Sequence, residues 1–282
     1  MGPLHETSVR DDVTVFTFGG EDVASSYGAN CTAVRGSGAT LLVDPLIAPS
    51  HARLVEEALV ARGAPPVRFV VLTHHHTDHA LGSSWFARRG ATVIAHDACR
   101  EGMEREHPGL IAGRRRDPAL SALFSDAESV PPGVLFAQSL TLDLGGVEAR
   151  VIHTGHGHTR GDAIVHLPGE SLAVCGDLVS NGYHVNLEDA SMDGFPRALA
   201  RLLSLGARTC VPGHGAPGGP DIVEAQKRYF SLVSSVVSAG TAAGRKESEI
   251  ADELRGRFPG FLLEMVLPET VRRFEAAAGT PG

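Results

Sequence analysis

The sequence predicts an α/β fold in which strands and helices pack in layers around one hydrophobic core. Two patterns indicate it: alternating or β-branched apolar runs, typical of strands, and apolar residues at helical spacing that end at glycine or proline. Hydrophobic residues make up 43% of the 282-residue chain and charged residues 21%, which is ordinary globular usage. We therefore expect a single domain over residues 1–282, with an insertion at about 100–133 and a helical extension at about 221–282.

Strands are expected where apolar residues alternate, or form a β-branched run, between turn signals. Residues 68–73 give the clearest case, because a nearly unbroken apolar run is typical of a strand covered on both faces. Gly36-Ser-Gly38 predicts a hairpin turn between two earlier strands, and Gly145-Gly146 separates two later ones. In chain order, the expected strands are residues 13–18, 31–34, 40–44, 68–73, 92–95, 138–144, 147–153, 163–167, 172–175 and 209–211.

Helices are expected where apolar residues recur every three or four positions before a stop signal. Asp78 can cap a helix that Gly90 ends. Residues 100–133 combine short helical patterns with four prolines, so we expect an irregular insertion there that could serve as a lid. In chain order, the expected helices are residues 50–62, 78–89, 195–205, 221–240, 247–257 and 269–278.

Charge and composition narrow the classes of partner. The net charge of −8 disfavours a nucleic-acid partner, since phosphate binding needs a basic surface. The one basic run, Arg114, Arg115 and Arg116, is interpreted as a solvated loop that could steer an anionic substrate. No secretory signal is evident, and no apolar run reaches the roughly 20 residues of a membrane span. We expect a cytoplasmic protein with neither a nucleic-acid nor a membrane partner, and its oligomeric state stays open.

The four cysteines are scattered without the spacing of a disulfide framework or a thiolate zinc site. We therefore expect reduced, buried thiols. Cys175 lies two residues before Asp177, but a small thiol in a core strand is the favoured interpretation.

A dense histidine cluster follows the strand at residues 68–73. His74, His76, Asp78 and His79 bring three imidazoles and a carboxylate into six residues, and few purposes other than metal binding need that density. The absence of cysteine favours a catalytic site, and imidazole with carboxylate suits zinc, iron or manganese. Alternation along the turn points His75 away, so it is left out.

Three further candidate ligands, His158, Asp177 and His214, lie in glycine-rich loops, where glycine permits close backbone approach and tight turns. His153 and His156 share the loop of His158 and are alternatives to it. Three other residues each allow two interpretations. Asp44 could orient a ligand histidine or cap a turn, and Tyr183 and His184 could face the substrate or lie in a surface loop.

Four segments carry a family resemblance: residues 74–79 (HHHTDH), 157–162 (GHTRGD), 175–179 (CGDLV) and 211–215 (VPGHG). In this order they resemble the motifs of the metallo-β-lactamase superfamily, over roughly residues 13–220. The resemblance implies a four-layer αβ/βα sandwich, with two mixed, mostly antiparallel sheets flanked by helices. It implies that His74, His76 and His158 hold one metal, that Asp78, His79 and His214 hold a second, and that Asp177 bridges the two.

The resemblance also implies a reaction. Two Zn²⁺ ions per chain, with iron or manganese as alternatives, would activate a hydroxide that attacks the carbonyl of an ester, thioester, lactone or lactam in a small molecule. Asp78 would both bind metal and relay a proton. Aspartate at Asp177, where many true β-lactamases have cysteine or serine, resembles the glyoxalase II and lactonase branches. Two ions, two carboxylates and a hydroxide sum to about +1, which favours an anionic substrate.

Three rival functions remain at this stage: a persulfide dioxygenase with a single iron, a nuclease of the same superfamily, and a non-catalytic metal-binding module. The complete set of seven ligands favours two metals over the first and third. The acidic charge disfavours the second.

Overall fold

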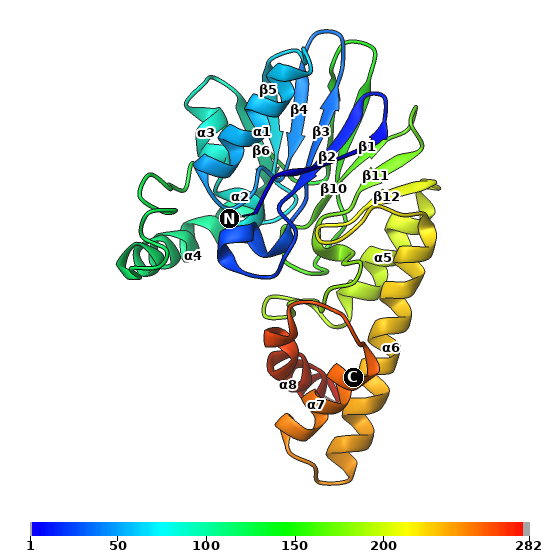
Figure 1. The fold of residues 1–282 in the computed structure, drawn as a ribbon. Helices are drawn as coiled ribbons and strands as arrows, with labels where there is room; N and C mark the ends of the chain where they lie inside the picture. Colours follow the sequence, from blue (N-terminus) through cyan, green and yellow to red (C-terminus); the bar gives the residue numbers. More distant parts are fainter. Residues whose placement is uncertain (1, 279–282) are drawn as a thin grey trace.

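The structure is a computed structural model that describes residues 2–278. Two β-sheets pack face to face at its centre. Helices α1 to α4 lie outside one sheet and α5 and α6 outside the other, so the molecule has four layers (Figure 1). The predicted fold class, an α/β sandwich of two sheets flanked by helices, is confirmed. The division into one domain with an insertion and an extension stays a prediction, and its residues 1 and 279–282 lie outside the described part of the chain.

The first sheet has seven strands in sequence order, antiparallel from β1 to β4 and parallel from β4 to β7. Its strands are β1 (His5–Arg10), β2 (Val13–Thr17), β3 (Cys31–Arg35), β4 (Thr40–Val43), β5 (Val67–Val71), β6 (Thr92–His96) and β7 (Val134–Phe136). The second sheet has the order β12-β11-β10-β9-β8, with only β11 and β12 parallel. Its strands are β8 (Ser139–Asp143), β9 (Glu148–His153), β10 (Ala163–Leu167), β11 (Leu172–Val174) and β12 (Thr209–Val211).

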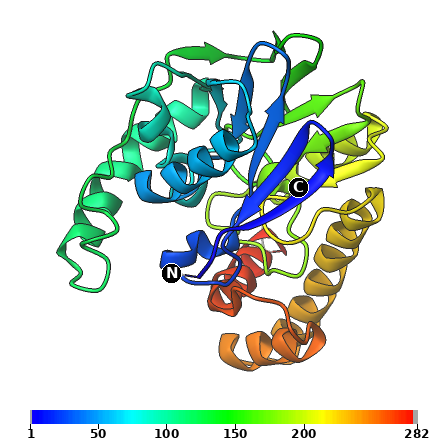
Figure 2. The ribbon, with the colours of Figure 1, turned by 45° about the horizontal axis from the view of Figure 1, so that its top comes forward.

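The helices lie around the two sheets. They are η1 (Val23–Gly28), α1 (Pro49–Ala61), α2 (Thr77–Ala80), α3 (Ser83–Ala87), α4 (Asp97–Arg116), η2 (Gly176–Leu178), α5 (Gly194–Ser204), α6 (Pro220–Ala242), α7 (Glu247–Arg257), η3 (Glu264–Val266) and α8 (Leu267–Ala278). Helices α6, α7 and α8 pack on one another, and α7 and α8 lie below the two sheets in Figure 1 rather than on an outer face of a sheet (Figures 1 and 2). Among the described residues, no helix is both long and apolar enough to cross a membrane.

Strand periodicity explains why the sheets stack. In β4, Leu41 and Val43 face the second sheet, whereas Leu42 faces the helices outside the first. In β10, Val165 packs between the sheets and Ile164 packs toward α5 and α6. Side chains that alternate along a strand bury both faces of each sheet, so helices must cover the outer faces. The four cysteines are free and buried, as predicted.

Two elements at the first sheet differ from the sequence prediction. Residues His5–Arg10, for which no strand was predicted, form β1, a largely exposed edge strand that pairs with β2. The predicted helix at residues 78–89 is two short helices, α2 and α3. The chain breaks at Gly82, where a Cβ would collide with the carbonyl oxygen of Pro45 and the N–H donates to Leu46.

The insertion also differs from expectation. Its first part is a continuous helix, α4, of 20 residues that runs through Pro108, and Arg114, Arg115 and Arg116 form its last turn rather than a loop. A buried stripe at a spacing of four residues, Cys99, Met103, His107 and Ile111, holds this helix on the body of the protein. His107 obscured the pattern because histidine is not an apolar residue.

Candidate metal centre

The candidate ligands lie on loops that follow strands of both sheets. His74 and His76 are in the turn after β5, and Asp78 and His79 are in α2, which begins directly after that turn. His158 follows β9, Asp177 lies in η2 after β11, and His214 follows β12. Glycine permits the close approach of these loops, since a Cβ at Gly213 would collide with the Asp177 carboxylate.

Donor atoms of all seven residues converge in two groups. His74, His76, His158 and Asp177 form one, and Asp78, His79 and His214 form the other, with ligand atoms in each group within 4.8 Å of one another. In the first, His158 Nε2 lies 3.0 Å from His76 Nδ1. In the second, Asp78 Oδ2 lies 3.4 Å from His79 Nε2 and 3.5 Å from His214 Nε2.

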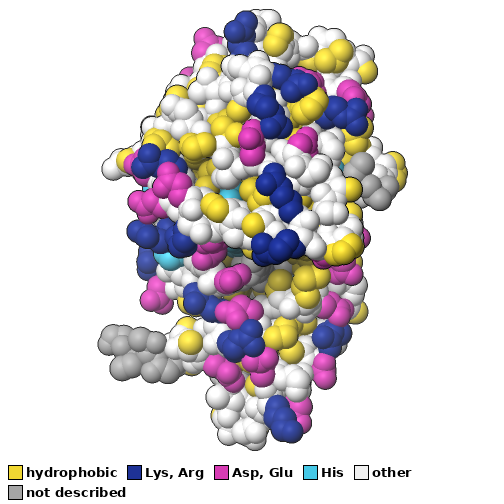
Figure 3. All heavy atoms as spheres, turned by 90° about the vertical axis from the view of Figure 1, so that its left-hand side faces the viewer, with side chains coloured by type: hydrophobic (Ala, Val, Ile, Leu, Met, Phe, Trp, Pro, Cys, Tyr) yellow, Lys and Arg dark blue, Asp and Glu magenta, His cyan; other side chains and the backbone are white. Residues whose placement is uncertain are grey.

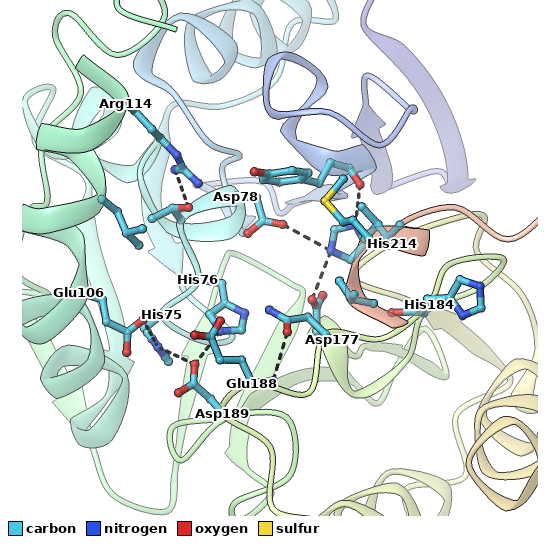
Figure 4. Close-up of a pocket in the computed structure, with 18 residues that line it drawn as sticks. His75, His76, Asp78, Glu106, Arg114, Asp177, His184, Glu188, Asp189 and His214 are labelled. Carbon is cyan, nitrogen blue, oxygen red and sulfur yellow. Dashed lines mark hydrogen bonds and ion pairs between the residues drawn. The ribbon is translucent and has the colours of Figure 1, made fainter. Parts of the chain in front are cut away.

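The Asp177 carboxylate lies between the two groups, and Figure 4 shows it near His214 and Asp78. Its Oδ2 is 3.6 Å from His158 Nε2 and 3.2 Å from His214 Nε2, whereas its Oδ1 is 3.2 Å from His79 Nε2. A single carboxylate therefore reaches nitrogens of both groups, which is the arrangement required of a ligand that two metals share.

Two observations indicate that the residues fit divalent metal ions. His74 Nε2 is buried and has no hydrogen-bond partner, although buried polar atoms almost always have one. The Nε2 atoms of His79 and His214 face each other at 3.3 Å. A cation between such lone pairs would satisfy both, and imidazole with carboxylate is the donor set of catalytic zinc.

Outer contacts set which nitrogen of each ring faces the centre. His214 Nδ1 donates to the carbonyl oxygen of Tyr27 at 3.0 Å, so its Nε2 keeps a lone pair. His79 Nδ1 lies 3.1 Å from Asp44 Oδ2, and His76 Nε2 lies 3.0 Å from Asp189 Oδ2. Each contact leaves the inner nitrogen of the ring free to bind a metal.

Asp44 follows β4, and its carboxylate is hydrogen-bonded to Thr73 and His79. Its carboxylate accepts from the Thr73 N–H at 2.8 Å and from the Thr73 hydroxyl at 2.6 Å, in addition to its contact with His79. The residue has a φ of 57°, in the left-handed region that aspartate tolerates better than most residues. These contacts connect the end of β4 directly to His79, one of the candidate ligands.

Burial and neighbouring charges shift the pKa values of the candidate ligands in different directions. Burial lowers the pKa of His74 well below its usual value and that of His158 to about 3, so both rings are neutral, which is the form that binds metal. Burial would raise the pKa of Asp78, but the neighbouring His79 and His214 outweigh it and lower that pKa to about 2. Both Asp78 and Asp177 are therefore anionic near neutral pH.

The remaining candidate histidines lie elsewhere. His153 Nδ1 donates to the Asp162 carbonyl oxygen and the ring stacks on His96, whereas His156 Nε2 donates to the Asp189 carbonyl oxygen. Of the three histidines in this loop, His158 is the one whose ring enters the ligand groups. His75 points away from them, as expected, and contacts Glu106 at 3.0 Å.

Tyr183 and His184 take positions that give little support to substrate contact. The Tyr183 hydroxyl donates to the Gly20 carbonyl at 3.0 Å, and the side chain is buried. The His184 ring turns away from the cavity (Figure 4). It packs against Tyr229, whose hydroxyl lies 3.0 Å from His184 Nδ1.

Sequence reasoning missed several residues. Asp162 accepts the backbone N–H groups of His158 and Thr159, so it shapes the loop that presents His158. Its place at the end of the GHTRGD segment was the available signal. Asp189 carries no motif at all, and its contact with His76 spans 113 residues of sequence.

The ligand groups open into a cavity of about 280 Å³. One wall comes from α4 and α2 and the other from η3 and the loop after η2. On the face of the molecule that carries α4, basic side chains are scattered among acidic ones rather than gathered in a stripe (Figure 3).

Comparisons with known proteins agree with this geometry. The family model described as the metallo-β-lactamase superfamily matches residues 26–214. A hydroxyacylglutathione hydrolase of Methylococcus capsulatus is 29% identical over 222 residues, which are 78% of this chain and 70% of that protein. One from Acidiphilium cryptum is 34% identical over 178 residues, covering 63% of this chain and 60% of that protein. A metallo-β-lactamase type 2 of Bacteroides fragilis is 31% identical over 101 residues, 34% of this chain and 41% of that enzyme.

Solved structures show the same fold. A metallo-β-lactamase from Pontibacter korlensis superposes with a TM-score of 0.63 at 23% identity, covering 79% of this chain and 96% of that one. The metallo-β-lactamase FIM-1 from Pseudomonas aeruginosa gives a TM-score of 0.66 at 18% identity, covering 80% and 94%. The family model spans well over half of the chain and includes all seven clustered residues. The chain therefore belongs to the metallo-β-lactamase superfamily of metal-dependent hydrolases.

Proposed function

We propose that the protein is a hydrolase with two divalent metal ions, zinc in the first instance, that cleaves an ester, thioester, lactone or lactam bond of a small molecule. The observation that carries the proposal is the pair of ligand groups joined through Asp177. His74, His76 and His158 would hold one ion, and Asp78, His79 and His214 the other. Similarity to hydroxyacylglutathione hydrolases makes a thioester the first substrate to test.

Two bound divalent ions would lower the pKa of a water molecule to near 7 and polarise the carbonyl under attack. The chain would then orient the reactants and move a proton. Asp78 lines the cavity and is anionic, so its carboxylate can orient the attacking water and accept its proton. Asp44, Asp189 and the Tyr27 carbonyl would hold three ligand rings in the orientation that presents the inner nitrogen.

Metal analysis together with an activity panel tests the proposal. Protein purified without added metal is expected to contain two zinc ions per chain by elemental analysis and to hydrolyse a member of a thioester, ester, lactone and lactam panel. One iron per chain, with oxygen uptake on a persulfide and no hydrolysis, would replace the hydrolase with a dioxygenase. Full metal loading with no hydrolysis of the panel would indicate a non-catalytic metal-binding protein.

Asp44→Ala is expected to lower zinc affinity about 10- to 100-fold, because a carboxylate that orients a ligand histidine typically has an effect of this size. It also leaves the buried Thr73 donors without an acceptor, which should cost on the order of 3 kcal/mol of the free energy of unfolding. Competition with a chelating dye and urea unfolding measure the two effects.

Two further variants serve as controls for the Asp44→Ala measurement. Asp44→Asn keeps an acceptor oxygen and tolerates the positive φ, so it should lose less than alanine does. Asp143→Ala removes an exposed carboxylate that accepts from Gly145 in a distant turn, and it should leave zinc affinity unchanged. Wild-type zinc affinity in Asp44→Ala would exclude the orienting role.

A further inference from the structure

We propose that Arg114 forms a carboxylate-binding subsite beside the metal centre, so that the preferred substrates are acyl compounds with an anionic group at the end of an apolar chain. The proposal rests on the hydrolase function above and names its substrate class. It assigns the last turn of α4 a direct part in substrate recognition.

Arg114 reaches into the cavity from α4, where Thr77, Phe124 and the Tyr27 side chain adjoin it. One of its terminal nitrogens donates to the Thr77 hydroxyl at 2.8 Å, and Thr77 lies between the candidate ligands His76 and Asp78. Its guanidinium lies 4.9 Å from the centre of the Phe124 ring, which is buried. Figure 4 shows this side chain on the same side of the cavity as Asp78. The charge is therefore fixed close to the metal-binding loop.

Within residues 2–278, Arg114 forms no ion pair with an Asp or Glu side chain, although it is half-buried and lines the cavity together with Asp78. The next residue, Arg115, differs because it donates to the carbonyl oxygens of Phe124 and Ala127 and tethers the loop after α4. A guanidinium presents five donors in a planar fork that matches a carboxylate, so the open side of Arg114 is suited to an oxyanion.

Beyond the candidate ligands, three acidic side chains also line the cavity, but they do not prevent an anion from binding at Arg114. Glu106 and Asp189 contact His75, and Asp189 also contacts His76. Both carboxylates therefore contact imidazole rings and not the part of the cavity beside Arg114. Glu188 also lines the cavity, but it is exposed to solvent, which screens its charge.

The apolar part of the proposed substrate follows from the rim of the cavity. Leu110 lies four residues before Arg114, on the same face of α4, and is 42% exposed. Met265 in η3 is 63% exposed and lines the same cavity with Leu263 and Val266. Large apolar side chains on both walls of a cavity favour an alkyl chain between them, because its burial removes apolar surface from water.

Binding of dicarboxylates tests the subsite without requiring turnover. The zinc-loaded protein is titrated calorimetrically with succinate, glutarate, adipate, pimelate and suberate, each compared with the monocarboxylate of the same chain length. One carboxylate of either probe can reach the metal centre, but only a dicarboxylate can also reach Arg114. We expect the best dicarboxylate to bind about 10- to 100-fold more tightly than its monocarboxylate partner, as for one charge-assisted hydrogen-bonded pair.

Three variants assign that preference to the residue. Arg114→Gln should reduce it to less than about twofold, and Arg114→Lys should keep only part of it, since lysine lacks the planar fork. Arg116→Gln is the matched control: it removes the same charge from the same exposed helical turn, but Arg116 does not line the cavity, so the preference should persist. Circular dichroism and thermal melting verify that each variant is folded. An unchanged preference in Arg114→Gln, or an equal loss in Arg116→Gln, would overturn the proposal.

A pair of esters separates the subsite from the reaction itself. The para-nitrophenyl monoester of adipate and para-nitrophenyl hexanoate have acyl chains of equal length and differ by one terminal carboxylate. Arg114→Gln should lower kcat/KM for the adipate ester about 10- to 100-fold more than it lowers kcat/KM for the hexanoate ester. Equal turnover of both esters by the wild type would retain the hydrolase and overturn the subsite. A dicarboxylate preference without any hydrolysis would retain the subsite and exclude the hydrolase.

Discussion

Asp177→Asn is expected to reduce hydrolysis about 1000-fold or more and to leave fewer than two metal ions per chain. The carboxylate lies within 3.2 Å of nitrogens on both His79 and His214 and reaches toward His158. An amide has the same shape but no negative charge, and one of its two polar atoms is a hydrogen-bond donor. It therefore cannot hold two cations together or offset their repulsion.

Elemental analysis of the purified variant and kcat/KM on the best substrate measure the two effects. Asp193→Asn is a suitable control, because Asp193 is exposed at the start of α5 and its side chain makes no cap hydrogen bond. Two metals per chain with wild-type turnover in Asp177→Asn would exclude the shared-ligand role.

Asp78→Asn is expected to lower kcat by about 100- to 10,000-fold, the range typical of a lost general base or acid. The Asp78 carboxylate lies at the cavity, 3.4 Å from His79 Nε2 and 3.5 Å from His214 Nε2, and those histidines keep its pKa at about 2 against the effect of burial. An asparagine in its place cannot accept the proton of the attacking water.

Metal content distinguishes the two roles assigned to Asp78. Two metals per chain with the expected fall in kcat would support the proton-relay role. The same fall with one metal per chain would reduce Asp78 to a metal ligand. Asp126→Asn, a change at an exposed position of the loop after α4, should leave kcat unchanged. Unchanged turnover in Asp78→Asn would refute both roles.

The helix α4 connects the insertion to the metal-binding loop through more than Arg114. The ring of His107 contacts the carbonyl oxygen of His75 at 2.6 Å, and burial lowers the His107 pKa to about 4, so the ring is neutral and donates this hydrogen bond. Gly102 lies so close to the His75 ring that a Cβ there would be 2.5 Å from Cγ. The insertion is thus packed on the candidate site rather than separate from it.

The sequence by itself determined the fold class and the set of candidate ligands. Apolar periodicity predicts the strands and helices, and residues directly after a strand lie at its carboxyl end whatever the neighbouring strands are. His74, His158, Asp177 and His214 could be named for this reason, and the structure brings them together from four loops. The four-layer sandwich and the division of the ligands between two metals came from the resemblance of four short motifs to a known superfamily. The helix through Pro108 and the break at Gly82 were not predicted, because each depends on what the segment packs against.

Only the tertiary structure decided what surrounds those ligands. The contacts of His79 with Asp44, of His76 with Asp189 and of His214 with Tyr27 join residues 35, 113 and 187 positions apart. Arg114 appeared as part of a solvated basic run, yet the structure places it in the cavity beside Thr77. A charged residue has the same local pattern whether it faces water or a substrate. The difference is set by the packing of α4, which no short stretch of sequence encodes.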